Sequence, residues 1–270
     1  MKFTSKEIQL HYLGFLNTPC LWINNALFGL NQFQIESKEQ QFNSEINTNL
    51  RLGKYIERFV SFQLEQQKSI KILLENIQIQ NNKITIGELD CLLINYKQPI
   101  HLEIIYKFYL YDDSIGNSEI EHFIGPNKKD ALIEKLNKLN EKQLPLLYSS
   151  YCKPYLEDLD LSSENIKQLV YFKAQLFLPY RKQSIKLDKL NQDCIIGFYI
   201  NKEELSYFKD CKFYIPNKKD WLIQPKKNVN WMIFDDFNIK AKEYFAQQFS
   251  PLTWVKNQNG LIDKVFLVWW

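Results

Sequence analysis

The chain has 270 residues, of which 45% are hydrophobic and 15% aromatic, so a large folded core is expected. Its net charge of +3 does not by itself indicate a nucleic-acid-binding protein. No segment reaches the roughly 18 consecutive apolar residues of a membrane-spanning helix, and the first residues lack the apolar core of a signal peptide. Five widely spaced cysteines without a Cys-x-x-Cys pair indicate reduced thiols. We therefore expect a cytoplasmic protein without a membrane partner.

Several catalytic motifs are absent from the sequence. The eight glycines never form a Gly-x-Gly arrangement, which excludes a dinucleotide fingerprint and a phosphate-binding P-loop. The three histidines do not have the spacing of zinc ligands, and no Gly-x-Ser-x-Gly nucleophile motif occurs. Carboxylate and lysine chemistry is what remains.

The first part of the chain is predicted to be helical. Residues 1–43 are expected to form short helices packed by aromatic side chains, followed by a loop rich in Gln and Asn. From residue 44 to about residue 67, apolar side chains recur at helical spacing, and Glu57 lies at the border of this apolar stripe. Glu57 could reach the surface on which the helix packs, or it could face solvent.

Three strands joined by hairpin-sized links are predicted next, over Ile70–Gln80, Ile84–Asn95 and Ile100–Asp112. A long helix is predicted over Lys128–Tyr148 and a further strand over Leu169–Tyr180. The predicted order is therefore helix, three strands, helix, strand.

The last part of the chain alternates short strand-like and helical pieces and holds five of the six tryptophans. It is predicted to be an α/β extension, either a small appendage or a continuation of the same sheet. We thus expect an N-terminal helical segment over residues 1–43, a core over 44–185 and a C-terminal extension over 186–270.

Two of the predicted strands carry charged residues in apolar surroundings. Because side chains alternate along a strand, Glu88 and Asp90 share one face. By the same count, His101, Glu103 and Lys107 share a face of the next strand. Carboxylates that converge inside an apolar sheet are costly to bury unless a cation compensates them, and a divalent metal is the usual cation. The alternative is a solvated sheet face with a cross-strand Glu–Lys pair.

The sequence Pro-Asn-Lys-Lys-Asp occurs twice, at residues 126–130 and 216–220, and both copies are expected to begin helices. Paired lysines at a helix N-terminus suit a bound anion such as a phosphate. Alternatively, Pro and Asn simply begin a helix and the lysines are solvated. Five residues are too few to establish an internal duplication.

Four ordered motifs resemble a family of bacterial proteins catalogued as domain of unknown function 1853. The motifs are Leu52-Gly-Lys-Tyr-Ile-Glu57, Gly87-Glu-Leu-Asp90, His101-Leu-Glu-Ile-Ile-Tyr-Lys-Phe-Tyr-Leu110 and Gly125-Pro-Asn-Lys-Lys-Asp130. That family is placed in the PD-(D/E)XK phosphodiesterase superfamily, the restriction-endonuclease-like fold of many nucleases. The resemblance therefore implies an α/β core with the helix–three strands–helix–strand order.

The resemblance also implies the roles of four residues. Asp90 and Glu103 would hold Mg²⁺ or Mn²⁺, and Glu57 would add to the coordination of the ion. Lys107 would attend the attacking water. The implied activity is the metal-dependent hydrolysis of nucleic acid.

Three further residues are candidates for contacts with substrate. Lys128 and Lys129 would grip the phosphate backbone of nucleic acid, with DNA preferred to RNA as the partner. Gln143 could also contact a substrate, or it could be a surface glutamine.

The position of the lysine departs from the superfamily pattern, which places it two residues after the second acid, where this chain has Ile105. At about 3.3 Å per residue, the backbones of Glu103 and Lys107 would be roughly 13 Å apart. A lysine that leans back, or a bulge in the strand, could close the gap. Otherwise Lys107 is structural or contacts phosphate, and the protein is an inactive nuclease-like scaffold that binds nucleic acid or a protein. Glu88 also competes with Asp90 as the ligand, and the family pattern favours Asp90.

Overall fold

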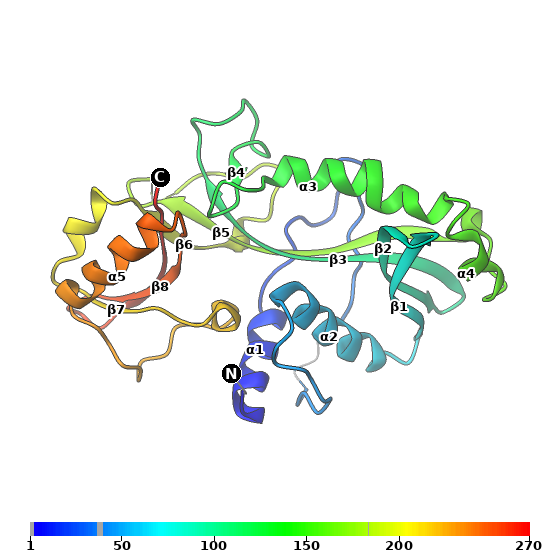
Figure 1. Cartoon of the computed structure of the whole chain (residues 1–270), viewed down its shortest axis with the longest axis horizontal. Coiled ribbons are helices and arrows are strands. Elements are labelled where there is room, and N and C mark those ends of the chain that lie inside the picture. Colours follow the sequence, from blue (N-terminus) through cyan, green and yellow to red (C-terminus); the bar gives the residue numbers. More distant parts are fainter. Residues whose placement is uncertain (1–2, 37–39, 183) are drawn as a thin grey trace. The chain divides into compact units, whose positions relative to one another are not determined.

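The computed structural model describes residues 3–36, 40–182 and 184–270 (Figure 1). The chain divides into two compact units. The first unit comprises Met1–Leu16, Cys20–Tyr106 and Glu134–Lys173. The second unit comprises Asn17–Pro19, Lys107–Ile133 and Ala174–Trp270. Two long strands, β3 (Gln98–Tyr111) and β5 (Lys167–Pro179), contribute residues to both units.

The fold is mixed α/β, and the described strands belong to one nine-stranded sheet with the order β1-β2-β3-β5-β6-β9-β8-β7, in which β4 pairs with β3. The first three strands are antiparallel neighbours, whereas β6 runs parallel to β5 and β9. The remaining strands are β1 (Ile70–Asn81), β2 (Ile84–Asn95), β4 (Phe123–Ile124), β6 (Ile195–Ile200), β7 (Lys212–Tyr214), β8 (Leu252–Lys256) and β9 (Ile262–Leu267).

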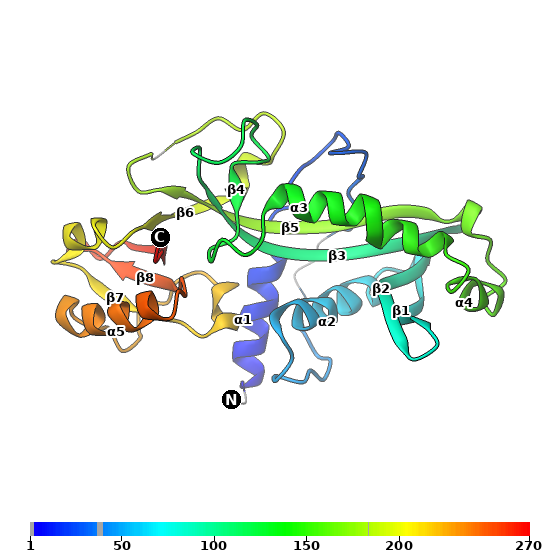
Figure 2. The same cartoon turned by 45° about the horizontal axis from the view of Figure 1, so that its top comes forward.

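The first unit has helices on both faces of its strands. In Figures 1 and 2, α2 lies on one side of β2 and β3, and the helical segment that begins with α3 lies on the other side. The helices that contribute to this unit are α1 (Ser5–Leu16), α2 (Leu52–Glu65), α3 (Leu132–Lys138), the π-helical turn η1 (Leu139–Gln143), the 3₁₀ helix η2 (Leu144–Tyr148), α4 (Lys153–Glu157) and η3 (Ser163–Asn165).

Aromatic side chains hold α1 and α2 together in the first unit. The Tyr12 ring lies 5.4 Å from the Phe59 ring and 5.4 Å from the Phe62 ring, and Phe42 packs 5.1 Å from Phe59. These rings are buried, so the apolar stripe read from the sequence does face a core.

Tight turns fix the register of the first three strands. The β1–β2 link consists of Asn82 and Lys83, and Asn82 has a φ of +55°. The β2–β3 link consists of Tyr96 and Lys97, and Tyr96 has a φ of +56°. Two-residue hairpins favour positive φ because its twist matches that of the strands, and Asn tolerates it readily.

The second unit packs α5 (Phe234–Ala246) on its end of the sheet. Phe213 of β7 stacks on Phe237 of α5 with 4.1 Å between ring centroids, and Val255, Val265 and Leu267 complete the buried cluster. Its short 3₁₀ helices are η4 (Gln192–Cys194), η5 (Glu204–Phe208) and η6 (Lys218–Trp221).

The predicted order of helix, three strands, helix and strand is confirmed, and the C-terminal residues continue the same sheet. The predicted start of the long helix at Lys128 is wrong, because residues 125–130 form a tight turn and the helix begins at Leu132. Lys128 has a φ of +53°, which a helix does not allow. Strand β8 was not predicted. In the part of the chain that the structure describes, no helix has the length and apolar character needed to cross a bilayer.

Candidate functional site

Three of the predicted site residues lie on adjoining elements of the first unit: Glu57 on α2, Asp90 on β2 and Glu103 on β3. Glu103 is completely buried, Glu57 is buried and Asp90 is half-buried. The antiparallel pairing of β2 with β3 extends to Cys91 and Leu102. Beyond that pair, a carboxylate oxygen of Asp90 accepts the backbone N–H of Ile104 at 2.9 Å. The Asp90 side chain thus accepts a backbone N–H of β3 just beyond the last residue pair of β2 and β3.

Glu103 is held by side chains on both of its carboxylate oxygens. Oε1 lies 3.1 Å from Nε2 of His101, and Oε2 accepts the amide of Gln143 at 2.5 Å. The amide of Gln168 lies 3.0 Å from Nδ1 of His101 and also donates to the carbonyl of Leu144 at 2.7 Å. Because Nδ1 accepts from Gln168, Nε2 carries the hydrogen and donates it to Glu103. The orientation of this buried carboxylate is therefore fixed.

The cation beside these carboxylates is Lys54, on the first turn of α2. Its ammonium donates to Glu57 at 2.9 Å, to Asn76 at 2.7 Å and to the carboxylate of Glu88. The Lys54 side chain is 40% exposed. Burial opposes its charge, but the hydrogen bonds with Glu88 and Glu57 outweigh burial and raise the pKa of Lys54.

The carboxylates hold more negative charge than their partners neutralise. Burial, followed by the nearby charge of Glu103, raises the pKa of Asp90 to about 8, although the Ile104 N–H and Lys54 oppose the shift. The charge of Glu57 adds to the rise. Burial also raises the pKa of Glu57, against the effect of Lys54. A cation at Asp90 would relieve both effects.

Asp90 and Glu103 offer the oxygen ligands that Mg²⁺ prefers, and Mg²⁺ needs only one or two protein carboxylates because it keeps several waters. Burial and the charge of Glu103, which together raise the pKa of Asp90, are effects that such an ion would offset. Over residues 3–36, 40–182 and 184–270, no group of three or more His, Cys, Asp or Glu side chains is placed to hold a metal. A metal held by Asp90 and Glu103 would therefore take most of its remaining ligands from water.

The lysines predicted from the sequence belong to the second unit. Lys107 donates to Asp130 at 2.6 Å, and Lys128 lies 3.6 Å from Asp112. Lys129 is exposed. Lys107 therefore has a carboxylate partner of its own, and the lysine bonded to Glu57 and Glu88 in the first unit is Lys54.

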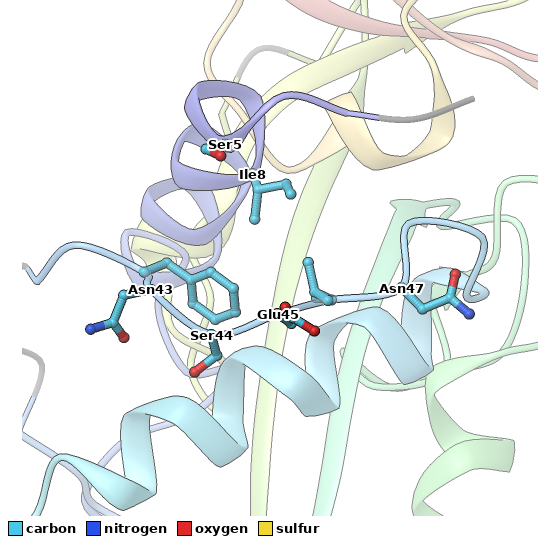
Figure 3. Close-up of a pocket in the computed structure, with 8 residues that line it drawn as sticks. Ser5, Ile8, Asn43, Ser44, Glu45 and Asn47 are labelled. Carbon is cyan, nitrogen blue, oxygen red and sulfur yellow. The ribbon is translucent and has the colours of Figure 1, made fainter.

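A cavity of about 690 Å³ lies between α1 and the loop that precedes α2, also in the first unit. Figure 3 shows residues that line it, Ser5 and Ile8 on α1 and Asn43, Ser44 and Glu45 on this loop. Among the residues that the structure describes, its lining contains one ionisable side chain, Glu45, so these residues offer no grouping of catalytic side chains.

The sequence did not identify Lys54, His101 or Gln168 as members of the site. Lys54 lies in the first of the four motifs, three residues before Glu57, so the two share a face of α2. This three-residue spacing was the feature of the sequence that could have identified Lys54 as a partner of Glu57. Gln143 was noted as a substrate contact or a surface residue, but in the structure it binds Glu103.

The comparison with protein families is decisive for classification. The family described as "Domain of unknown function (DUF1853)" matches residues 28–268, which is nearly the whole chain. The chain belongs to this family. The match extends well beyond the four motifs, through the last strand of the DUF1853 chain. No curated protein and no solved structure gives a significant match.

Proposed function

We propose that this DUF1853 protein is a metal-dependent phosphodiesterase of the PD-(D/E)XK type that hydrolyses nucleic acid. One observation carries the proposal: Glu57, Asp90 and Glu103 come from three adjoining elements, and burial, together with the charges of Glu103 and Glu57, raises the pKa of Asp90 to about 8. Such an excess of buried carboxylate charge is what a divalent cation stabilises. Perturbed carboxylates of this kind are concentrated at functional sites.

Asp90 and Glu103 are the residues that would hold Mg²⁺ or Mn²⁺, with Glu57 next to them. The ion, when bound, neutralises charge on a phosphate and lowers the pKa of a coordinated water. His101 and Gln143 act as positioning residues, since their hydrogen bonds fix the carboxylate of Glu103.

Lys54 takes the role that the superfamily pattern gives to the third-strand lysine. Its ammonium is partly exposed and donates all three of its N–H groups to Glu57, Glu88 and Asn76, so it would act through its fixed positive charge, by stabilising developing negative charge. Lys107 is bound to Asp130 instead.

The test is cleavage of end-labelled DNA by purified protein with Mg²⁺, with Mn²⁺ and with EDTA. Asp90→Asn and Glu103→Gln should each lower the rate by at least about 100-fold, because each removes a ligand charge. Glu65→Gln, an exposed change on α2, should cleave like the wild type. Equal cleavage by all variants would show that the nuclease activity belongs to a contaminant and would contradict the proposal.

A second candidate function is an inactive nuclease-like scaffold that binds nucleic acid or a protein. The observation in its favour is that both oxygens of Glu103 already accept hydrogen bonds from His101 and Gln143. Saturable binding of DNA in Mg²⁺ without cleavage by the wild type would favour the scaffold over the enzyme.

A further inference from the structure

The second unit contains a cluster of lysines around one partly exposed carboxylate, Asp130. Lys107 donates to Asp130 at 2.6 Å, and the two side chains are 36% and 41% exposed. Lys218 lies close enough to be attracted by Asp130 and repelled by Lys107. The two Pro-Asn-Lys-Lys-Asp copies are thus brought together in space, because Asp130 ends the first and Lys218 belongs to the second.

Lys218 has no carboxylate in salt-bridge contact among the described residues. Its ammonium instead lies 3.2 Å from the centroid of the Trp221 ring and 5.3 Å from that of Phe108. The residue is exposed overall, but protein atoms around the ammonium lower its pKa to about 7, with Asp130 opposing and Lys107 adding to the decrease. An ammonium held against rings without a bonded counter-ion is ready to receive an anion.

The loop that carries Lys128 is fixed by backbone and side-chain hydrogen bonds. The Gly125 N–H donates to the Asp130 carbonyl at 2.7 Å, and the Trp270 indole donates to the Pro126 carbonyl at 3.0 Å. The Lys128 ammonium lies 3.9 Å from the centroid of the Trp270 ring. The ammonium groups of Lys128 and Lys218 therefore each pack against a tryptophan ring. Because these side chains are already ordered, a ligand that binds them loses little conformational entropy.

Gly125 explains why Asp130 can sit inside this turn. A Cβ at Gly125 would lie 1.9 Å from an Asp130 carboxylate oxygen, so only glycine leaves room for that carboxylate. Asp130 thereby stays beside Lys107 and near Lys218, where it partly neutralises both.

We propose that Lys107, Lys128 and Lys218 form a binding site for the phosphate groups of a nucleic-acid backbone, with Asp130 as an internal counter-ion that competes with the phosphate. Phosphate contacts by lysines supply sequence-independent affinity and position a nucleic acid without reading its bases. The choice of nucleic acid over other polyanions rests on the proposed function of the first unit. The existence of an anion site is argued from the second unit alone and does not depend on that function.

The test is the binding of a fluorescein-labelled DNA duplex to the full chain in EDTA, measured by anisotropy over a range of salt concentrations. Lys107→Ala/Lys218→Ala should weaken binding at least about tenfold and reduce the slope of log affinity against log salt by about two. The matched control is Lys240→Ala/Lys242→Ala, which removes two exposed charges from α5 of the same unit. Equal losses in the two double variants would overturn the site.

A gain in affinity provides a readout that misfolding cannot imitate. Asp130→Asn removes the competing carboxylate and keeps its shape, so it should strengthen DNA binding about two- to fivefold, by weakening the competition for phosphate. Glu243→Gln on α5 makes the same charge change at an exposed position and should have less effect. Weaker binding by Asp130→Asn would contradict the assignment of Asp130 as a competitor.

Three further outcomes separate the possible ligands. Displacement of the duplex by an equal concentration of inorganic phosphate would assign the site to small anions and overturn the nucleic-acid assignment. Binding to vesicles that contain anionic lipid, with no binding to DNA, would overturn it too. DNA binding in EDTA that Lys107→Ala/Lys218→Ala weakens would support the site even if the wild type does not cleave DNA in Mg²⁺, which keeps this site distinct from a failure of the proposed hydrolysis.

Discussion

The two units place an aspartate in opposite electrostatic surroundings. Asp90 in the first unit is half-buried next to Glu103 and Glu57, and burial together with their charges raises its pKa. Asp130 in the second unit, whose side chain is 41% exposed, is bound by Lys107, with Lys218 nearby. The contrast indicates that carboxylates predominate around Asp90, which suits a metal ion, and that lysines predominate around Asp130, which suits an anion.

Replacing Lys54 of the first unit and Lys107 of the second unit, each by Met, tests this contrast most strongly. Lys54→Met should lower the rate of DNA hydrolysis about 100-fold, because the site loses the positive charge that stabilises developing negative charge. Lys107→Met should leave the rate at saturating DNA within about threefold of wild type and weaken binding instead. Single-turnover rates over a range of DNA concentrations separate the two effects. The reverse pattern would show that Lys107, and not Lys54, serves the chemistry.

A pair of glycine variants tests whether the second unit depends on the Asp130 turn. Gly125→Ala should lower the free energy of unfolding by about 1–3 kcal/mol, because its Cβ would collide with Asp130. Gly53→Ala on α2 meets no atom within 4 Å and should raise it by up to about 1 kcal/mol. Urea unfolding of both variants gives the comparison. A Gly125→Ala protein as stable as the wild type would mean that the turn tolerates displacement of Asp130.

The pH dependence of stability tests the surroundings of Asp90. Its pKa is raised from 3.8 to about 8 in the folded protein, so between these values the unfolded chain releases a proton that the folded chain retains. Asp90 should therefore leave the free energy of unfolding unchanged below about pH 4. It should lower that free energy progressively as the pH rises towards 8. Asp90→Asn should be more stable than wild type by about 1–2 kcal/mol at pH 8 in EDTA, with the difference vanishing near pH 4. A difference that does not change with pH would contradict this reading of Asp90.

Lys264 in the second unit should show the opposite trend. It is buried, its ammonium donates to Gln175 at 3.1 Å and to the Trp221 carbonyl at 2.8 Å, and burial lowers its pKa from 10.5 to about 7. As the pH falls from about 10 to 7, the unfolded chain takes up a proton that the folded chain does not, so this lysine lowers stability over that range. The stability of Lys264→Met relative to wild type should rise by about 1 kcal/mol over the same range. No such change would indicate that Lys264 is charged in the folded protein.

Much of the first unit could be predicted from local sequence signals. The two-residue links at Asn82-Lys83 and Tyr96-Lys97 mark the hairpins, and the apolar spacing in residues 52–64 marks α2. Asp90 and Glu103 stand out because they interrupt apolar strands, which is a pattern that a single sequence displays directly.

The partners of these residues could not be predicted because they are distant in sequence. Lys54 meets Glu88 34 residues later, and Glu103 meets Gln143 40 residues later. The turn at residues 125–130 was mistaken for a helix start because Pro and Asn begin helices as readily as turns. Only the positive φ of Lys128 and the close contact of Gly125 with Asp130 reveal the difference.

The carboxylates around Asp90 are proposed to hold a divalent cation. Calorimetric titration with Mg²⁺ and Mn²⁺ tests this most directly. The wild type and Glu65→Gln should bind one ion per chain saturably, and Asp90→Asn and Glu103→Gln should lose at least about 90% of that affinity. Circular dichroism of each variant verifies that it is folded. Absence of binding by the folded wild type, or equal binding by all four proteins, would contradict the claim.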